Sequence, residues 1–237
     1  MRQFFKNSGL IVLAGFLSLP VLAEGEGWKE LNSQTSDLMY NKKFAEAVEP
    51  AKKTVAAASK EFGPEDTKTV SAMNTLARAY KETGDTANAV IYFKKVIETR
   101  EKISGPEDKD LAGPLENLAG LYGDQGRFGE AEALWVRALG IKKTVYGEDD
   151  PFVGATALRL AGVYKKEEKY AEAVPLYEQG LAMLGEAEYP DYKQLASVSG
   201  ELADIYEKTS RNTEAKELRE TAKESLEKYD EIHRNDK

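Results

Sequence analysis

The chain has 237 residues, of which 41% are hydrophobic and 31% are charged, and its formal net charge is -8. A chain of this length and composition can bury a sizeable core, which excludes a disordered segment and a mini-protein that depends on staples. It contains no Cys, so disulfides, thiolate catalysis and cysteine-ligated zinc sites are excluded as well.

Residues 1–23 differ in character from the rest of the chain. Two basic residues precede the apolar run 9–19, and Val21 and Ala23 take the small-residue positions that a signal peptidase favours. The run is too short to span a hydrocarbon core of about 30 Å comfortably. We therefore expect a cleaved signal peptide with cleavage after Ala23, a mature chain that begins at Glu24 and does not insert in a membrane, and a periplasmic or secreted location.

Removal of this segment makes the chain more acidic. The 33 basic residues fall to 31 against 41 acidic ones, which gives a net charge of -10. Nucleic acids and anionic membranes bind basic surfaces, so neither is an expected partner.

Residues recur along the remaining chain at a spacing of 42. The recurring residues are Leu76, Leu118, Leu160 and Leu202; Ala77, Ala119, Ala161 and Ala203; Tyr80, Tyr122, Tyr164 and Tyr206; and Ala47, Ala89, Ala131, Ala173 and Ala215. A fixed period of this kind is typical of stacked repeats. Small alanines let helices approach closely, so we expect Ala131 and Ala173 to lie at helix contacts. Ala112 lies off this ladder, and we expect it to tolerate a larger side chain.

Each unit has the pattern of a helix, a tight turn and a second helix. In the third unit, apolar residues follow helical spacing over 115–122 and again over 128–138. Gly84 and Gly126 lie where the first helix of a pair must end, a position that favours positive φ.

Short acidic segments separate the units: "GPED" twice, then "GEDDP" and "YPDY". Gly ends a helix, Pro keeps it from continuing, and Asp caps the next helix. The alternating oxygen ligands and closing Glu of a calcium-binding EF-hand loop are absent, so we interpret these segments as caps.

The spacing divides residues 24–237 into one repeat domain of five units, at about 28–66, 67–108, 109–150, 151–192 and 193–237. In the first unit, Gln34 and Thr35 replace the expected Leu and Ala, which leaves open whether its leading helix forms. The charged segment 215–237 predicts a solvent-facing capping helix.

The stretch "NLAGLYGDQGRFGEAEALWVRALGI" followed by "YGEDDP" resembles the tetratricopeptide repeat, in the 42-residue form of kinesin light chains and many bacterial proteins. The resemblance covers nearly all of the chain after residue 23. It implies an all-α, right-handed superhelical solenoid of about five antiparallel helix pairs. It also implies that the first helices of the pairs line a concave groove that receives a peptide segment of a partner protein.

Carried over residue by residue, the resemblance assigns groove positions on each first helix. The candidate partner-binding residues are Arg78, Lys81, Asn117, Gly120, Arg159, Gly162 and Lys165. The two glycines would leave the groove open, although close helix packing explains a mid-helix Gly equally well. Asn117 can hydrogen-bond a peptide backbone, and the basic side chains can pair with carboxylates or remain solvated.

Catalysis requires a base and a nucleophile that converge, and the sequence contains no such constellation. His233, the single His, lies in a polar terminal segment without a partner group. We therefore expect no enzyme activity, no cofactor and no metal site. The predicted function is a non-catalytic protein interaction scaffold of the cell envelope. The alternatives are a self-assembling repeat protein, in which the end repeats of homo-oligomers stack, and a regulatory or accessory subunit of a separate enzyme.

Overall fold

The computed structural model describes residues 27–234, and within this range the regular structure is entirely helical. The ten α-helices and one 3-10 helix are α1 (Trp28–Tyr40), α2 (Phe44–Phe62), α3 (Thr67–Glu82), α4 (Thr86–Ser104), η1 (Lys109–Leu111), α5 (Ala112–Asp124), α6 (Phe128–Tyr146), α7 (Pro151–Lys166), α8 (Tyr170–Glu186), α9 (Tyr192–Lys208) and α10 (Asn212–His233). The expected all-α solenoid is confirmed. The predicted signal peptide, residues 1–23, lies outside the described residues.

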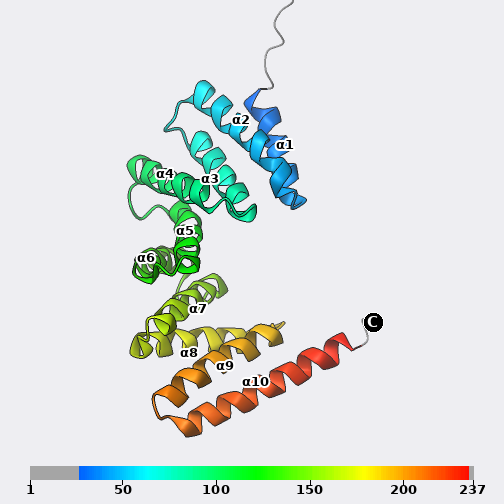
Figure 1. Ribbon diagram of the computed structural model, residues 1–237, viewed down its shortest axis with the longest axis vertical. Helices are drawn as coiled ribbons and strands as arrows, with labels where there is room; N and C mark the ends of the chain where they lie inside the picture. Colours follow the sequence, from blue (N-terminus) through cyan, green and yellow to red (C-terminus); the bar gives the residue numbers. More distant parts are fainter. Residues whose placement is uncertain (1–26, 235–237) are drawn as a thin grey trace, which may run out of the picture.

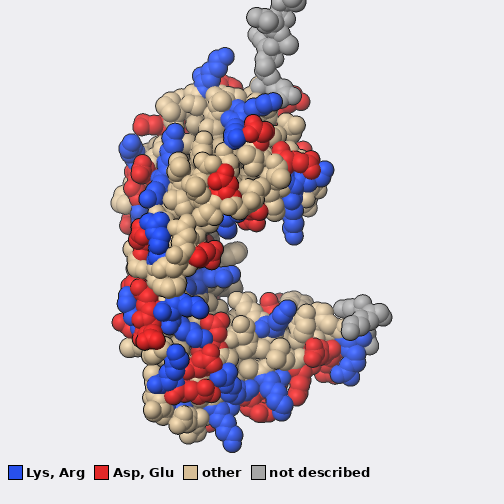
Figure 2. Space-filling model, in the orientation of Figure 1, with Lys and Arg blue, Asp and Glu red and all other residues tan. Residues whose placement is uncertain are grey.

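The helices stack in antiparallel pairs along a curved path (Figure 1). Helices α1, α3, α5 and α7 lie on the inner side of the arc, and α4 and α6 lie on its outer side. Figure 2 shows that the surface is hollowed on the inner side, between the first repeats and the last. The first helices of the pairs therefore form the concave surface of the molecule. Among the described residues, no helix is both long enough and apolar enough to cross a bilayer.

A residue with left-handed backbone conformation separates the two helices of every pair. Gly84 and Gly126 have φ of +81° and +72°, as their positions in the sequence predict. Lys42, Glu168 and Ser210 take the equivalent positions in the other repeats, with φ of 57°, 60° and 62°. Such conformations are rare for residues with a Cβ, so the stacked helices impose the turn where Gly is missing.

The acidic segments between the repeats cap helices as expected. The Asp66 carboxylate accepts a hydrogen bond from the backbone N–H of Lys68 at 2.8 Å, and Asp150 accepts one from that of Phe152 at 2.7 Å. Asp108 caps η1 instead of α5, so a short 3-10 turn precedes that helix. Helix α8 departs from the pattern, because Ala187 follows it in an extended conformation where the other repeats have Gly.

The alanine ladder lies at the centre of the helix packing. Its five members in the second helices, Ala47, Ala89, Ala131, Ala173 and Ala215, are at most 1% exposed. The expectation for Ala112 is wrong, because this residue is 6% exposed and belongs to the core. It takes the repeat position of Val70 and Gly154, which are also buried, so the ladder is not the only buried face of these helices.

The leading helix of the first repeat forms despite its polar residues. Thr35 is buried, and its hydroxyl donates to the carbonyl of Leu31 at 2.7 Å and lies 3.0 Å from the hydroxyl of Thr54 on α2. Because this hydrogen bonding satisfies Thr35, a polar residue occupies a position where the other repeats bury Ala.

The last helix differs from the other second helices on the face where a further repeat would pack. In α6 this face carries Trp135 and Leu139, which are 8% and 7% exposed. The equivalent residues of α10 are Arg219 and Lys223, and both are exposed. Helix α10 therefore carries a charged surface on this face, as the composition of the segment predicts.

Candidate functional site: the concave groove

The concave groove is the inner face formed by α3, α5, α7 and α9. All seven candidate residues lie on three of these helices: Arg78 and Lys81 on α3, Asn117 and Gly120 on α5, and Arg159, Gly162 and Lys165 on α7. Each is exposed or half-buried, so none is enclosed in the core.

Lys81 of the second repeat and Asn117 of the third bind each other across the junction between these repeats. The Lys81 ammonium donates to Oδ1 of Asn117 at 2.8 Å, and Nδ2 of Asn117 donates to the carbonyl of Gly113 at 2.9 Å. Both ends of the Asn117 amide are thus engaged within the chain. A partner could use this amide only by displacing one of these hydrogen bonds.

Lys165 is paired in a similar way with the last repeat. Its ammonium lies 3.1 Å from Oδ2 of Asp204 and 3.8 Å from Oε2 of Glu201, both on α9. Arg219 on α10 reaches the other oxygen of Asp204 at 2.6 Å. Burial alone would raise the pKa of Asp204, but the hydrogen bonds from Lys165 and Arg219 hold it below its usual value.

Arg78 and Arg159 differ from the two lysines, because they are exposed and make no ion pair within residues 27–234. Arg159 lies on the edge of an open cleft of about 530 Å³ between α7 and α9, which we call the C-terminal cleft. Its lining also includes Leu158, Tyr177, Lys193 and Glu201. On an acidic protein, these two guanidinium groups are cations available to a ligand.

Three glycines of α5 stand in open space on the same face. A Cβ built on Gly113, Gly120 or Gly123 would meet no neighbouring atom within 4 Å. On α7, a Cβ on Gly162 would lie 3.8 Å from the Tyr177 hydroxyl, an ordinary contact. Close helix packing, the alternative explanation, therefore does not account for these glycines.

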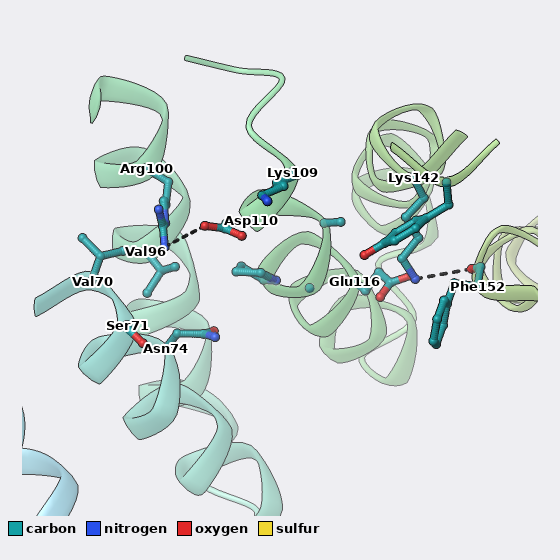
Figure 3. A pocket seen from close by; sticks show the side chains of 14 residues that line it. Val70, Ser71, Asn74, Val96, Arg100, Lys109, Asp110, Glu116, Lys142 and Phe152 are labelled. Atoms are coloured by element: carbon teal, nitrogen blue, oxygen red, sulfur yellow. Dashed lines mark hydrogen bonds and ion pairs between the residues drawn. The ribbon is translucent and has the colours of Figure 1, made fainter. Parts of the chain in front are cut away.

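A second cleft of about 590 Å³, the N-terminal cleft, lies at the edge of the groove and was not anticipated from the sequence (Figure 3). Ser71 and Asn74 of α3 face it from one side, and Lys142 and Phe152 face it from the other. The Phe152 ring is 63% exposed and lies 5.8 Å from the ring of Tyr146. The repeat offers one signal for this site, because position 74 recurs as Glu116, which also lines the cleft.

A hydrogen-bonded network lies on the Lys142 side of the N-terminal cleft. The Lys142 ammonium donates to Oε1 of Glu116 at 2.6 Å and to the Thr156 hydroxyl at 2.9 Å. Only 13% of the Lys142 side chain and 23% of the Glu116 side chain are exposed. This network joins α5, α6 and α7 and fixes the junction of the third and fourth repeats.

One further polar pair, Tyr177 and Glu201, is engaged within the chain. The Tyr177 hydroxyl donates to Oε2 of Glu201 at 2.6 Å, and burial together with this carboxylate raises the pKa of Tyr177 far above its usual value. No group of three or more His, Asp or Glu side chains in the described part of the chain is arranged to hold a metal ion. The geometry offers surfaces for recognition: open glycines, free guanidinium groups and exposed aromatic rings.

Comparison with solved structures gives the same architecture. The TPR-like repeats of a Podosopora anserina kinesin light chain are 25% identical to this chain, with a TM-score of 0.70 over 85% of this chain and 95% of theirs. BtubC (BKLC) from P. vanneervenii is 18% identical, with a TM-score of 0.74 over 85% of this chain and 80% of that one. MamA from Desulfovibrio magneticus RS-1 is 13% identical, with a TM-score of 0.67 over 88% and 99%. At these lower identities the likeness concerns the fold.

Comparison of the sequence with curated proteins gives no match. A family model for the tetratricopeptide repeat matches residues 36–102 and 110–186, which together are more than half of the chain. The two matched segments hold most of the helix pairs described above, including the glycines of α5. The chain belongs to the tetratricopeptide repeat family.

Proposed function

We propose that this protein is a non-catalytic scaffold that binds an extended segment of a partner protein in the concave groove. The tetratricopeptide fold suggests a protein interaction scaffold in general, and the glycines of α5 carry the assignment to this face. A Gly within a helix costs about 0.5 to 1 kcal/mol relative to Ala. A Cβ added at Gly113, Gly120 or Gly123 would meet no neighbouring atom within 4 Å, and three such residues favour a surface kept clear for a ligand.

The charged end of the solenoid supports groove binding over head-to-tail self-assembly. Stacking of copies would bring the outer face of α10 against a first helix, as α6 meets α7. Arg219 and Lys223 stand there in place of Trp135 and Leu139. Arg219 pairs with Asp204 and Glu207, and Lys223 pairs with Glu220, and stacking would remove these ion pairs from water. The cost of desolvating them disfavours self-assembly through this face.

We further propose that the protein acts in the cell envelope or outside the cell. The basic start, the apolar run and the small residues before Glu24 support export. N-terminal sequencing of the protein from its native host tests this directly: a stable product that begins at Glu24 is expected. A stable product that begins at Met1 would contradict export with cleavage.

Groove binding is tested with matched glycine variants. Gly120→Leu adds bulk to the groove, whereas Gly140→Leu adds the same bulk to α6, where the site is also open and exposed. Short peptides are selected from a random library on the wild-type chain, and their affinities for both variants are measured alongside thermal melts. We expect Gly120→Leu to lose binding and Gly140→Leu to retain it, with both melting no earlier than the parent. Equal affinities for all three proteins would place the binding surface elsewhere.

A further inference from the structure

The junction between the fourth and fifth repeats differs from the preceding junction in a set of side chains at repeat-equivalent positions. Between the third and fourth repeats, these positions hold the hydrogen-bonded network of Glu116, Lys142 and Thr156. One repeat of 42 residues later, they hold Leu158, Leu184 and Val198. Aliphatic side chains thus replace the polar network at every one of its three positions.

An open cavity of about 630 Å³ lies at this junction, between α7, α8 and α9, and we call it the apolar cavity. Its apolar lining includes Pro151, Ala155, Leu158, Met183, Leu184 and Ala187. Leu158 and Leu184 are only half-buried, so part of their apolar surface remains open to a ligand. The volume lies within the range of about 300 to 1,000 Å³ that is usual for sites that enclose small organic groups.

Met183 and Gly154 meet in the lining of the apolar cavity. A Cβ built on Gly154 would lie 2.3 Å from Sδ of Met183, so the thioether occupies the space that a side chain at residue 154 would need. Methionine side chains are flexible and polarisable, and they adapt to apolar groups of different shape. This part of the lining therefore suits an aliphatic side chain.

The charged residues that line the apolar cavity are both acidic. They are Asp149 and Glu186, which are exposed and make no ion pair with a residue in the range 27–234. Lys143, which is close to them in the sequence, pairs with Glu148 instead, at 3.7 Å. A cation at the cavity would therefore meet two carboxylates that no basic side chain of the described chain already binds.

The apolar cavity is continuous with the C-terminal cleft of the concave groove. Ala155, Leu158 and Gln194 line both of them. A partner segment that lies in the groove can therefore place one of its side chains in the cavity. The C-terminal cleft also contains Arg159 and Lys193, so the acidic lining distinguishes the cavity from that part of the groove.

We propose that the apolar cavity receives one aliphatic side chain of the bound partner segment, and that a Lys or Arg next to it in the partner pairs with Asp149 or Glu186. The aliphatic group gains affinity by leaving water. The acidic residues favour a basic neighbour and repel an acidic one. This inference rests on the proposed function and adds the chemistry of the partner to it.

The cavity can be tested without a partner. An isotope-labelled methyl group of Met183 reports on the cavity by NMR, and those of Met39 on α1 and Met73 on α3 are internal controls. We expect hexylammonium to shift the Met183 signal at a lower concentration than hexanoate does. The difference between the two probes should vanish in Asp149→Asn combined with Glu186→Gln. If neither probe shifts the Met183 signal, or if both act equally on the wild type, the inference is wrong.

The preference for a partner is tested with random short peptides selected on the wild-type chain. We expect enrichment of an aliphatic residue with Lys or Arg beside it. The affinity of such a peptide should fall about tenfold or more in Asp149→Lys combined with Glu186→Lys, because the peptide's cation then meets charges of its own sign. Ala187→Leu adds bulk to the cavity from within and should cause a similar loss.

The matched controls lie on α8 and do not line the cavity. Glu172→Lys reverses the charge of an exposed acid, and Ala171→Leu adds the same bulk to an exposed alanine. Both should leave the affinity of the peptide unchanged. Ala187 is exposed and follows α8 in extended backbone, so Ala187→Leu should melt as the parent does. Losses of affinity in the controls as large as those in the cavity variants would contradict binding at the cavity.

The outcomes separate this inference from groove binding. Peptides that lose affinity in Gly120→Leu but respond neither to the charge reversals nor to Ala187→Leu would overturn the inference and leave groove binding intact. Peptides whose affinity is unaffected by Gly120→Leu would overturn groove binding and this inference with it.

Discussion

A Cβ placed on Gly180 of α8 would lie 2.3 Å from Cγ and Cδ2 of Leu158 on α7. Leu158 thus fills the space that a side chain at residue 180 would need, and Gly180 is buried for this reason. This glycine differs in kind from those of α5, which face open space. The structure therefore distinguishes glycines required by packing from glycines that leave a surface clear.

The first prediction uses this difference. Gly180→Ala forces Leu158 out of its position, and we expect a net loss of about 1 to 3 kcal/mol in the free energy of unfolding, since the strain of overpacking exceeds the gain in helix propensity. Gly140→Ala in open space should gain up to about 1 kcal/mol. Urea unfolding of both variants measures these changes. A gain at both positions would mean that Leu158 relaxes freely.

The second prediction concerns the alanine ladder. Ala173→Leu overpacks a contact in which the parent residue is 0% exposed, so we expect it to lose about 1 to 3 kcal/mol. Ala171 lies two positions away on the same helix and is exposed, and its replacement by Leu should shift stability by no more than about 0.5 kcal/mol. Thermal and urea unfolding compare the two. Similar losses would show that the ladder is not the close contact between helices.

The third prediction is that the stabilisation of the fold by Asp204 is lost in acid. The pKa of Asp204 is held below its usual value in the folded chain, so its stabilising effect is present at pH above the ordinary value of about 4 and is lost as pH falls through the lowered pKa. We expect Asp204→Asn to be less stable than the parent at neutral pH and to converge with it in acid. Urea unfolding at a series of pH values follows this. Asp230→Asn is the control, because Asp230 is exposed on α10. If the free energies of unfolding of Asp204→Asn and the parent differ by the same amount at every pH, the loss is due to packing and not to the charge of Asp204.

The fourth prediction is that the stabilisation of the fold by Tyr206 is lost in alkali. Burial and the hydrogen bond to Glu178 raise the pKa of Tyr206 to about 12. An unfolded tyrosine loses its proton near pH 10, so the stabilising effect is full below that pH and is lost as pH rises toward about 12. Tyr206→Phe should therefore lose less stability than the parent over this interval. Absorbance titration of the phenolate checks the raised pKa itself, and a normal midpoint for every tyrosine would contradict it.

The sequence predicted the helices well because a repeat states the same information several times. The ladder of Ala131 and its equivalents identified the buried contacts, and the glycines at 84 and 126 located the turns. Ala112 was misjudged, because a single ladder does not reveal the second buried face that it shares with Val70.

The state of the groove side chains was harder to predict. Whether a lysine is free depends on residues in the next repeat, as the pairing of Lys165 with Asp204 shows. Asn117 was expected to offer its amide to a partner, but Lys81 and Gly113 engage it. Arg159 was recognised as a groove residue, and only the arrangement of its neighbours shows that it lacks an acidic partner among the described residues. Carrying groove positions over from the repeat family to this chain shows which side chains lie in the groove. It does not show which hydrogen bonds those side chains make.

The most direct measurement of groove binding is site-specific photo-cross-linking in the native host. A photoreactive phenylalanine derivative is placed at Gly120 in the groove or at Gly140 on α6, two helical positions that are both open to added bulk. If the concave groove is the binding face, a cross-linked partner forms from position 120 and not from position 140. The same adduct from position 140, or none from position 120 while position 140 reacts, would contradict binding in the groove.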